Sequence, residues 1–213
     1  MDALALLLAD SRFPSGGYAH SLGLEQAVAD GLTDVPAFAA ARQRLVAEAD
    51  ARIAVAARRG EDPLALDEEW CARCPSPVLR EAARRLGSQL LRSAETVWPD
   101  ERIAAYREAS SATPRPVALG VVGAVAGLDD EAVALLALYD DAATVTSAAL
   151  KLLPLDPAVT TRWLAELAPS MQRAAREAAA DTRPVAAQPA PAAVALELAA
   201  AVHQRKRERL FAS

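Results

Sequence analysis

Residues 14–25 contain the side-chain types that hydrolytic enzymes use for nucleophilic catalysis. Ser15 and Ser21 offer hydroxyl groups, His20 offers a general base, and Glu25 offers a carboxylate that could orient an imidazole. Neighbouring residues on a helix point about 100° apart, whereas a catalytic triad needs side chains that converge. The Gly-x-Ser-x-Gly turn of many hydrolases is also absent from the sequence. We therefore expect His20 and its neighbours to make contacts rather than to attack a substrate.

Cys71 and Cys74 have the Cys-x-x-Cys spacing of a metal-ligand pair. A structural zinc site needs two further ligands, and the candidates are carboxylates and two histidines, His20 and His203, all distant in the sequence. A redox role for this spacing would require a βαβ context that the chain lacks. We predict no metal ligands, and keep a small metal-binding protein that uses Cys71 and Cys74 as the alternative function.

Several other functional classes are disfavoured by motif and charge. Gly16-Gly17 is not followed by the Gly-Lys-Ser/Thr of a nucleotide-binding loop. A net charge of −5 argues against a nucleic-acid binder. The apolar run Val117–Leu128 is shorter than the roughly 20 residues of a membrane span, and no basic segment precedes Leu4–Leu8 as in a secretory signal. We expect a cytoplasmic protein with no membrane and no nucleic-acid partner.

The composition predicts an all-α fold. Hydrophobic residues make up 53% of the 213 positions and aromatic residues only 4%, and isoleucine occurs only at Ile53 and Ile103. Alanine and leucine favour helices, whereas isoleucine and the aromatic residues, which favour strands, are scarce. The length fits one domain, 1–213, which can bury a hydrophobic core.

Apolar periodicity and helix-breaking residues divide the chain into about nine helical segments, and no internal repeat is visible. The predicted segments are 19–31, 34–59, 64–73, 76–98, 100–109, 117–127, 130–153, 158–180 and 192–209. Thr33 or Asp34 is the expected cap of the second segment, and Ser76 that of the fourth. The Pro/Ala-rich connection 182–191 is either a linker or an ordered extended crossing.

Two further features suggest contact surfaces. Helix 130–153 carries a narrow polar stripe, which is either a solvated face or part of a subunit interface or channel wall: Asp140, Thr144, Ser147 and Lys151. The C-terminal tail, 203–213, places Leu210-Phe211 after four basic residues. It is either a frayed helix end or a docking peptide that orders on a partner.

The segment PSGGYAHSLGLEQAVADG, preceded by LLLADSRF, resembles the N-terminal signature of the UreF family of urease accessory proteins. Similar patches follow in the family's order at Arg84–Arg92, Pro116–Val122 and Ser147–Leu155, and the tail is similar to the family's Arg-Leu-Phe-x-Ser terminus. The chain departs from the family at Arg115, where many members carry histidine before the Pro-Val segment. A metal-handling role of that position is therefore in doubt.

The resemblance implies an all-helical cytoplasmic chaperone without catalytic activity, which dimerises and binds the accessory protein UreD (also called UreH). It implies recruitment of the GTPase UreG to apo-urease, and coupling of GTP hydrolysis to nickel insertion. Nickel is then a cargo and GTP belongs to the partner, so no cofactor is expected.

Carried over by position, the resemblance assigns two partner-binding groups. The recruitment face would contain Pro14, Ser15, Gly16, Gly17, Tyr18, His20, Ser21, Gly23, Glu25 and Arg92. The tail residues Arg209, Leu210, Phe211 and Ser213 would order against UreD. A channel through the accessory complex is a proposed route for nickel in this family, and the polar stripe Asp140–Lys151 would suit its wall.

Overall fold

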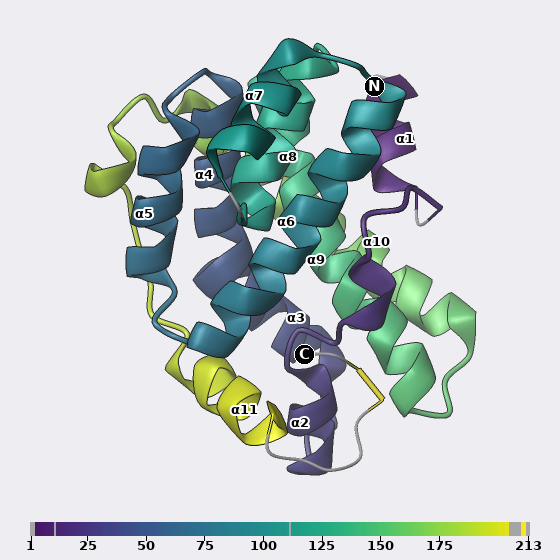
Figure 1. Ribbon diagram of the computed structural model, residues 1–213. Coiled ribbons are helices and arrows are strands. Elements are labelled where there is room, and N and C mark those ends of the chain that lie inside the picture. Colours follow the sequence, from purple (N-terminus) through teal and green to yellow (C-terminus); the bar gives the residue numbers. More distant parts are fainter. Residues whose placement is uncertain (1–2, 11, 111, 205–209, 212–213) are drawn as a thin grey trace.

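The protein is an all-α structure, as its composition predicts. A computed structural model describes residues 3–10, 12–110, 112–204 and 210–211, and these contain helices and connecting segments but no strand (Figure 1). The helices are α1 (Ala3–Ala9), η1 (Gly17–Ala19), α2 (Leu24–Ala29), α3 (Val35–Arg42), η2 (Gln43–Ala47), α4 (Glu48–Arg58), α5 (Pro63–Arg73), α6 (Pro77–Val97), α7 (Glu101–Ala109), α8 (Arg115–Val125), α9 (Asp130–Leu152), α10 (Pro157–Ala180), η3 (Val185–Ala187) and α11 (Val194–Gln204).

Helix α9 is the centre of the bundle. It packs against α10 and α4, while α8 packs between α4 and α6. One hydrophobic cluster joins α8 to α4 and α6, and a second joins α9 to α4 and α10. The apolar helix predicted at 117–127 is buried as expected, because neighbouring helices cover α8 on several sides.

Side-chain caps explain why most helix starts could be predicted. Asp34, Ser76 and Asp129 each accept a hydrogen bond from the backbone N–H three residues later, at the start of α3, α6 and α9. Asp62, Asp100 and Asp156 accept from the N–H two residues later in α5, α7 and α10. The predicted segment 34–59 is one helical rod that contains a π-helical turn, η2, between α3 and α4.

The prediction of a helix from Ala19 is wrong. Only Gly17–Ala19 forms a short 3₁₀ turn, and α2 begins at Leu24. Leu22 and Gly23 have left-handed backbone conformations, with φ of 53° and 90°, which interrupt a right-handed helix. His20 and Ser21 therefore lie in an irregular turn.

The Pro/Ala-rich connection is an ordered crossing. It includes η3, and Val185 is buried in the first hydrophobic cluster. The guanidinium of Arg73 donates to the Val185 carbonyl oxygen at 2.5 Å. Of the two predicted alternatives, these contacts favour the ordered crossing over a free linker.

Among the described helices, α9 is long and apolar enough to cross a membrane by length and composition. Half of its apolar window is buried inside the molecule, and it packs against α10, α4 and α8. This is the position of a core helix.

Gly120 lies where α8 packs closely against α4. A Cβ atom at this position would lie 2.2 Å from the Ala54 carbonyl oxygen and 2.6 Å from the Ala57 Cβ. Helix propensity alone predicts that Gly120→Ala stabilises the protein by about 1 kcal/mol. We expect the opposite sign, a loss of roughly 1–3 kcal/mol in the free energy of unfolding measured by urea denaturation, because the two backbones would have to separate. A stabilised variant would contradict this packing.

Candidate functional site

The turn at residues 13–17 is fixed to α6. The Pro14 carbonyl oxygen accepts hydrogen bonds from Gln89 Nε2 at 3.3 Å and from Ser93 Oγ at 2.8 Å. Gly16 has φ of 83°, and a Cβ atom there would lie 2.6 Å from Gln89 Oε1. The left-handed backbone conformation therefore favours glycine here, and a larger residue would also have to displace the end of the Gln89 side chain. Ser15 is half-buried, and Tyr18 belongs to η1.

His20 and Ser21 are buried at the end of this turn. Ser21 has no exposed surface, and its Oγ accepts the Glu25 backbone N–H at 3.4 Å. Burial, together with the positive charges of Arg115 and Arg85, lowers the pKa of His20. Because it is buried, the Ser21 hydroxyl is not accessible to a substrate in this conformation.

Glu25 binds the C-terminal part of the chain. Its carboxylate accepts the backbone N–H groups of Leu210 at 2.9 Å and Phe211 at 3.1 Å, and it lies 2.8 Å from His203 Nε2. Burial by itself would raise the pKa of Glu25, but the two N–H donors and His203 outweigh burial and lower it. The Glu25 carboxylate of the N-terminal segment thus binds the tail.

The described part of the tail packs on its own chain. The Phe211 side chain is buried in the second hydrophobic cluster, and Lys151 Nζ lies 5.1 Å from the centre of its ring. Leu210 is exposed. Arg209 and Ser213 lie outside the described residues, and ordering of the tail on a partner stays a prediction. Arg92, assigned to the recruitment face, is exposed on α6.

The polar stripe of α9 contacts other segments of this chain at three of its four positions. Asp140 forms an ion pair with Arg115 at 2.8 Å, Thr144 lies beside Gly17, and Lys151 lies against Phe211. Ser147 is exposed. The stripe is therefore more than a solvated face, and an interface or channel role stays a prediction.

Asp141, the residue after Asp140, forms an almost fully buried ion pair that connects α9 to α3. Arg42 Nη2 lies 2.8 Å from Asp141 Oδ1, and the two side chains are only 8% and 12% exposed. Arg42 Nη1 also donates to the Leu22 carbonyl oxygen at 3.3 Å. Arg42 therefore fixes the left-handed turn that precedes α2, a backbone conformation that is unfavourable for leucine by itself.

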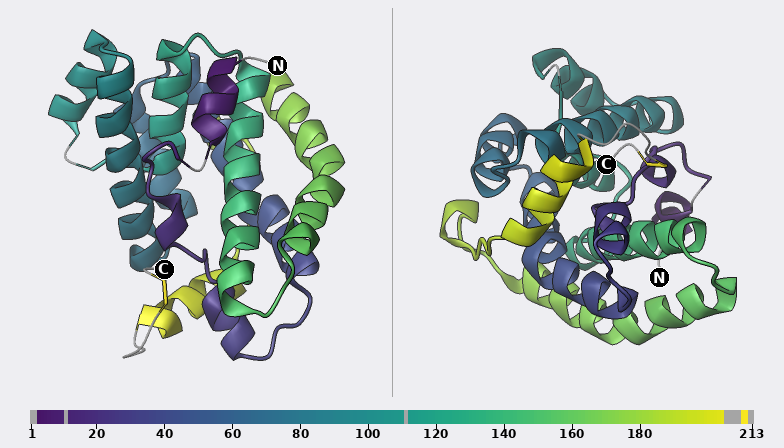
Figure 2. Two further views of the ribbon diagram at one scale, coloured as in Figure 1. Left: turned by 90° about the vertical axis from the view of Figure 1, so that its right-hand side faces the viewer. Right: turned by 90° about the horizontal axis from the view of Figure 1, so that it is seen from below.

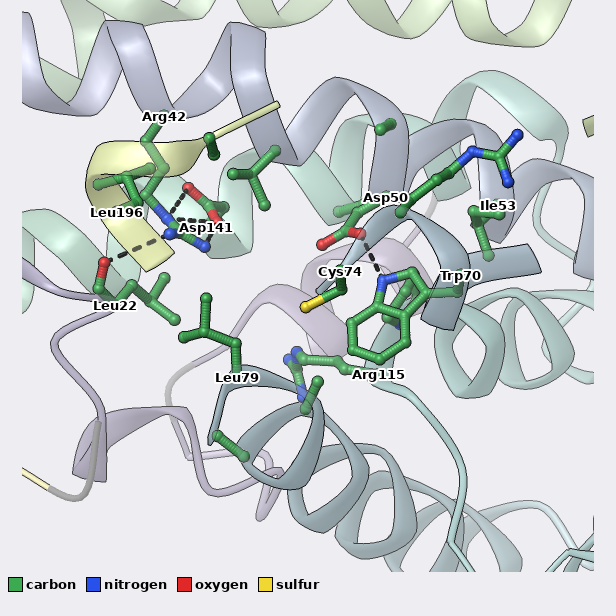
Figure 3. Close-up of a pocket in the computed structure, with 18 of the residues that line it drawn as sticks. Leu22, Arg42, Asp50, Ile53, Trp70, Cys74, Leu79, Arg115, Asp141 and Leu196 are labelled. Atoms are coloured by element: carbon green, nitrogen blue, oxygen red, sulfur yellow. Dashed lines mark hydrogen bonds and ion pairs between the residues drawn. The ribbon is translucent and has the colours of Figure 1, made fainter. Parts of the chain in front are cut away.

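A cavity of about 150 Å³ lies beside this ion pair (Figure 3). It extends from Gly17 and His20, past Arg42 and Asp141, to Asp50 and Cys74, and residues 190–197 form part of its wall. The Asp50 carboxylate accepts a hydrogen bond from Trp70 Nε1 at 2.9 Å. Burial, with a smaller contribution from the charge of Asp141, raises the pKa of Asp50 to about 6.

The two cysteines contact side chains of α5 and α6 and the backbone just before α6. Cys71 Sγ contacts Asp67 Oδ1 at 3.4 Å and Arg84 Nη2 at 3.0 Å, and Cys74 Sγ lies 3.9 Å from the Ser76 carbonyl oxygen. Burial raises the pKa of both thiols, that of Cys74 to about 11, so both are protonated at neutral pH. Within the described residues, no three His, Cys, Asp or Glu side chains are grouped as a metal site.

Sequence reasoning missed Arg42 and Asp50 as site residues. Both lie on a segment whose apolar spacing indicates only an amphipathic helix, and neither stands near a recognisable motif. The one available signal was Asp141 in the middle of an apolar helix, because such a charge needs a partner.

Asp50 makes stability depend on pH. Its pKa is higher in the folded protein than in an unfolded chain, so its contribution to stability is complete below about pH 4 and is lost as the pH rises through about 6. Asp50→Asn keeps an oxygen acceptor for Trp70 and removes the charge. We expect the variant to gain up to about 2–3 kcal/mol over wild type at pH 8, and little at pH 4, in chemical denaturation. Glu108→Gln, at an exposed glutamate, is the control, and a difference independent of pH would refute this account of Asp50.

Comparison with known proteins identifies the same family as the sequence motifs described above. The sequence model of the UreF family matches residues 25–168. A urease accessory protein UreF of Mycobacterium marinum is 42% identical over 174 residues, which cover 78% of this chain and 81% of the relative. A UreF of Mycobacterium tuberculosis is 40% identical over 188 residues (84% and 85%), and one of Mycolicibacterium vanbaalenii is 38% identical over 186 residues (83% and 85%). The chain belongs to the UreF family of urease accessory proteins.

Proposed function

We propose that this protein is an adaptor in urease maturation, which bridges a UreD/UreH-type accessory protein and a UreG-type GTPase on apo-urease. In this role it couples GTP hydrolysis by the partner to nickel insertion into the urease active site. It acts in the cytoplasm as a homodimer, nickel is its cargo, and it needs no cofactor of its own. Membership of the UreF family supports a role in urease maturation.

The outer face of α11 is the observation that carries the adaptor proposal. Val194, Leu198 and Val202 follow one another at four-residue spacing and are 59%, 64% and 49% exposed. Leu210, in the tail, is also exposed, at 60%. Apolar side chains gathered at one exposed face are typical of a protein-binding surface. We assign this face and the tail to the UreD/UreH-type protein.

A second surface is available for recruitment of the GTPase. The Pro14 turn is bound to α6 through Ser93, and Arg92, the preceding residue of α6, is exposed. The position of a polar turn beside an exposed arginine supports our assignment of residues 14–18 and Arg92 to this contact. Glu25, which the same motif supplies, connects this region to the tail.

The cavity is a candidate part of the nickel route. Asp140 and Thr144, from the polar stripe, line it together with Asp141 and Asp50. Carboxylate oxygens are ligands of divalent cations, and here Asp140 and Asp141 are paired with Arg115 and Arg42, which a cation would have to displace. We propose that nickel moves past these side chains in the assembled complex without a permanent site on this chain.

Reconstitution with Leu198→Asp tests the adaptor role. The purified chain is mixed with its cognate accessory protein, GTPase and apo-urease, and complex composition, GTP turnover and nickel-dependent urease activity are recorded. We expect Leu198→Asp to weaken binding of the accessory protein at least tenfold and to lower urease activation, because a charge would be placed in an apolar contact.

The matched control is Leu64→Asp, which changes a 43% exposed leucine on α5. This variant should assemble and activate urease as the wild type does. Urease activation that proceeds equally well without the chain would refute the proposed function. Normal assembly by Leu198→Asp would refute only the assignment of the α11 surface.

A further inference from the structure

Helix α11 has a second, inward face that covers the cavity. Leu196 and Glu197 of α11 line the cavity wall with Ala193, which directly precedes the helix, and Glu197 lies near enough to Cys74 to affect the pKa of its thiol. The helix lies across one end of the bundle, where it contacts α2 and α6 (Figures 1 and 2). The preceding crossing provides Ala190 and Pro191 to the same wall. The cavity is therefore closed on this side by one terminal helix.

The C-terminal end of α11 is fastened by one side chain of α2. His203 is 1% exposed, and its ring is bound to Glu25 at 2.8 Å. The Leu210 and Phe211 amides donate to the same carboxylate, and Phe211 is inserted into the core. We call these three contacts of Glu25 the Glu25 clasp.

We propose that α11 is a lid over the cavity and that the Glu25 clasp keeps this lid closed. Apart from the clasp, its buried apolar side chains are the small ones of Ala193 and Ala200, because the larger Val194, Leu198 and Val202 face solvent instead of the core. Elements with few buried apolar contacts open at lower free energy than the core does. Any ligand that takes the Leu210 and Phe211 amides away from Glu25 would therefore open the cavity.

The clasp links the two ends of the chain to the cavity by physical contact. Glu25 accepts hydrogen bonds from the tail, the tail follows α11 in sequence, and α11 lines the cavity next to Cys74 and Asp50. If the clasp opened, the Glu25 carboxylate would lose its hydrogen-bond donors and the His203 ring would lose its carboxylate partner. The free-energy difference that favours the closed lid over an open one would then be much smaller.

Cys74 provides a direct readout of lid opening in the isolated chain. Its thiol faces the cavity, whereas Cys71, three residues earlier on α5, is not part of the lining and contacts Asp67 and Arg84. These are the only cysteines of the sequence. N-ethylmaleimide labelling at pH 8, followed by mass spectrometry of peptides, gives a separate rate for each thiol.

We expect Glu25→Ala to raise the labelling rate of Cys74 at least tenfold and that of Cys71 less than twofold. Phe211→Ala removes the buried anchor and leaves the Glu25 carboxylate in place. As with Glu25→Ala, it should raise the labelling rate of Cys74 much more than that of Cys71. Glu108→Gln is the control for loss of an exposed carboxylate and should match the wild type.

Two outcomes would overturn the lid. Cys74 labelling that is unchanged in both variants would show that α11 does not limit access to the cavity. An equal rise at Cys71 and Cys74 would show that the variants loosen the whole fold. Phe211→Ala keeps the test decisive if Glu25→Ala does not fold, and neither result depends on the proposed adaptor role.

Discussion

The carboxylate of Glu25 binds groups that are 178, 185 and 186 residues away in the sequence: the ring of His203 and the backbone amides of Leu210 and Phe211. A carboxylate that is only 13% exposed needs hydrogen-bond donors, because its charge is costly to remove from water. The N-terminal segment supplies the acceptor and the tail supplies the donors. The conformation of each end therefore depends on the other.

A second buried charge positions Glu25 itself. Arg42 binds Asp141 on α9 and the carbonyl oxygen of Leu22, and the Leu22–Gly23 turn sets where α2 begins. A buried ion pair of this kind adds little to stability compared with apolar packing, but removal of one partner leaves an unpaired charge. The role of this ion pair is to hold Arg42 in place, so that Arg42 can bind the unfavourable turn that directs α2 toward the tail.

Local signals were sufficient for most of the helices. Ser76 and the prolines around it indicate the start of α6, and Asp129 indicates that of α9. The start of α2 could not be predicted, because it depends on a left-handed leucine whose carbonyl is bound by a distant arginine. The N-terminal motif and the tail could be singled out from the sequence, but their contact with each other could not, since no periodicity relates Glu25 to Phe211.

The cavity shows the same limit of sequence reasoning. Asp50 and Asp141 lie 91 positions apart by residue number, and only the packing of α4 on α9 brings them to one wall. A helical pattern reports which face is buried, but it does not report whether neighbouring faces meet without a gap. The polar stripe predicted at Asp140 was therefore visible as a pattern, while the cavity beside it was not.

Hydrogen exchange measures the central claim, that Glu25 secures α11 and the tail to their own chain. Amide exchange of residues 194–204 and of residues 140–152 is compared between the wild type and Glu25→Ala by mass spectrometry. The account predicts exchange of residues 194–204 at least tenfold faster in the variant, with residues 140–152 unchanged. Equal exchange of residues 194–204 in the two proteins would contradict it.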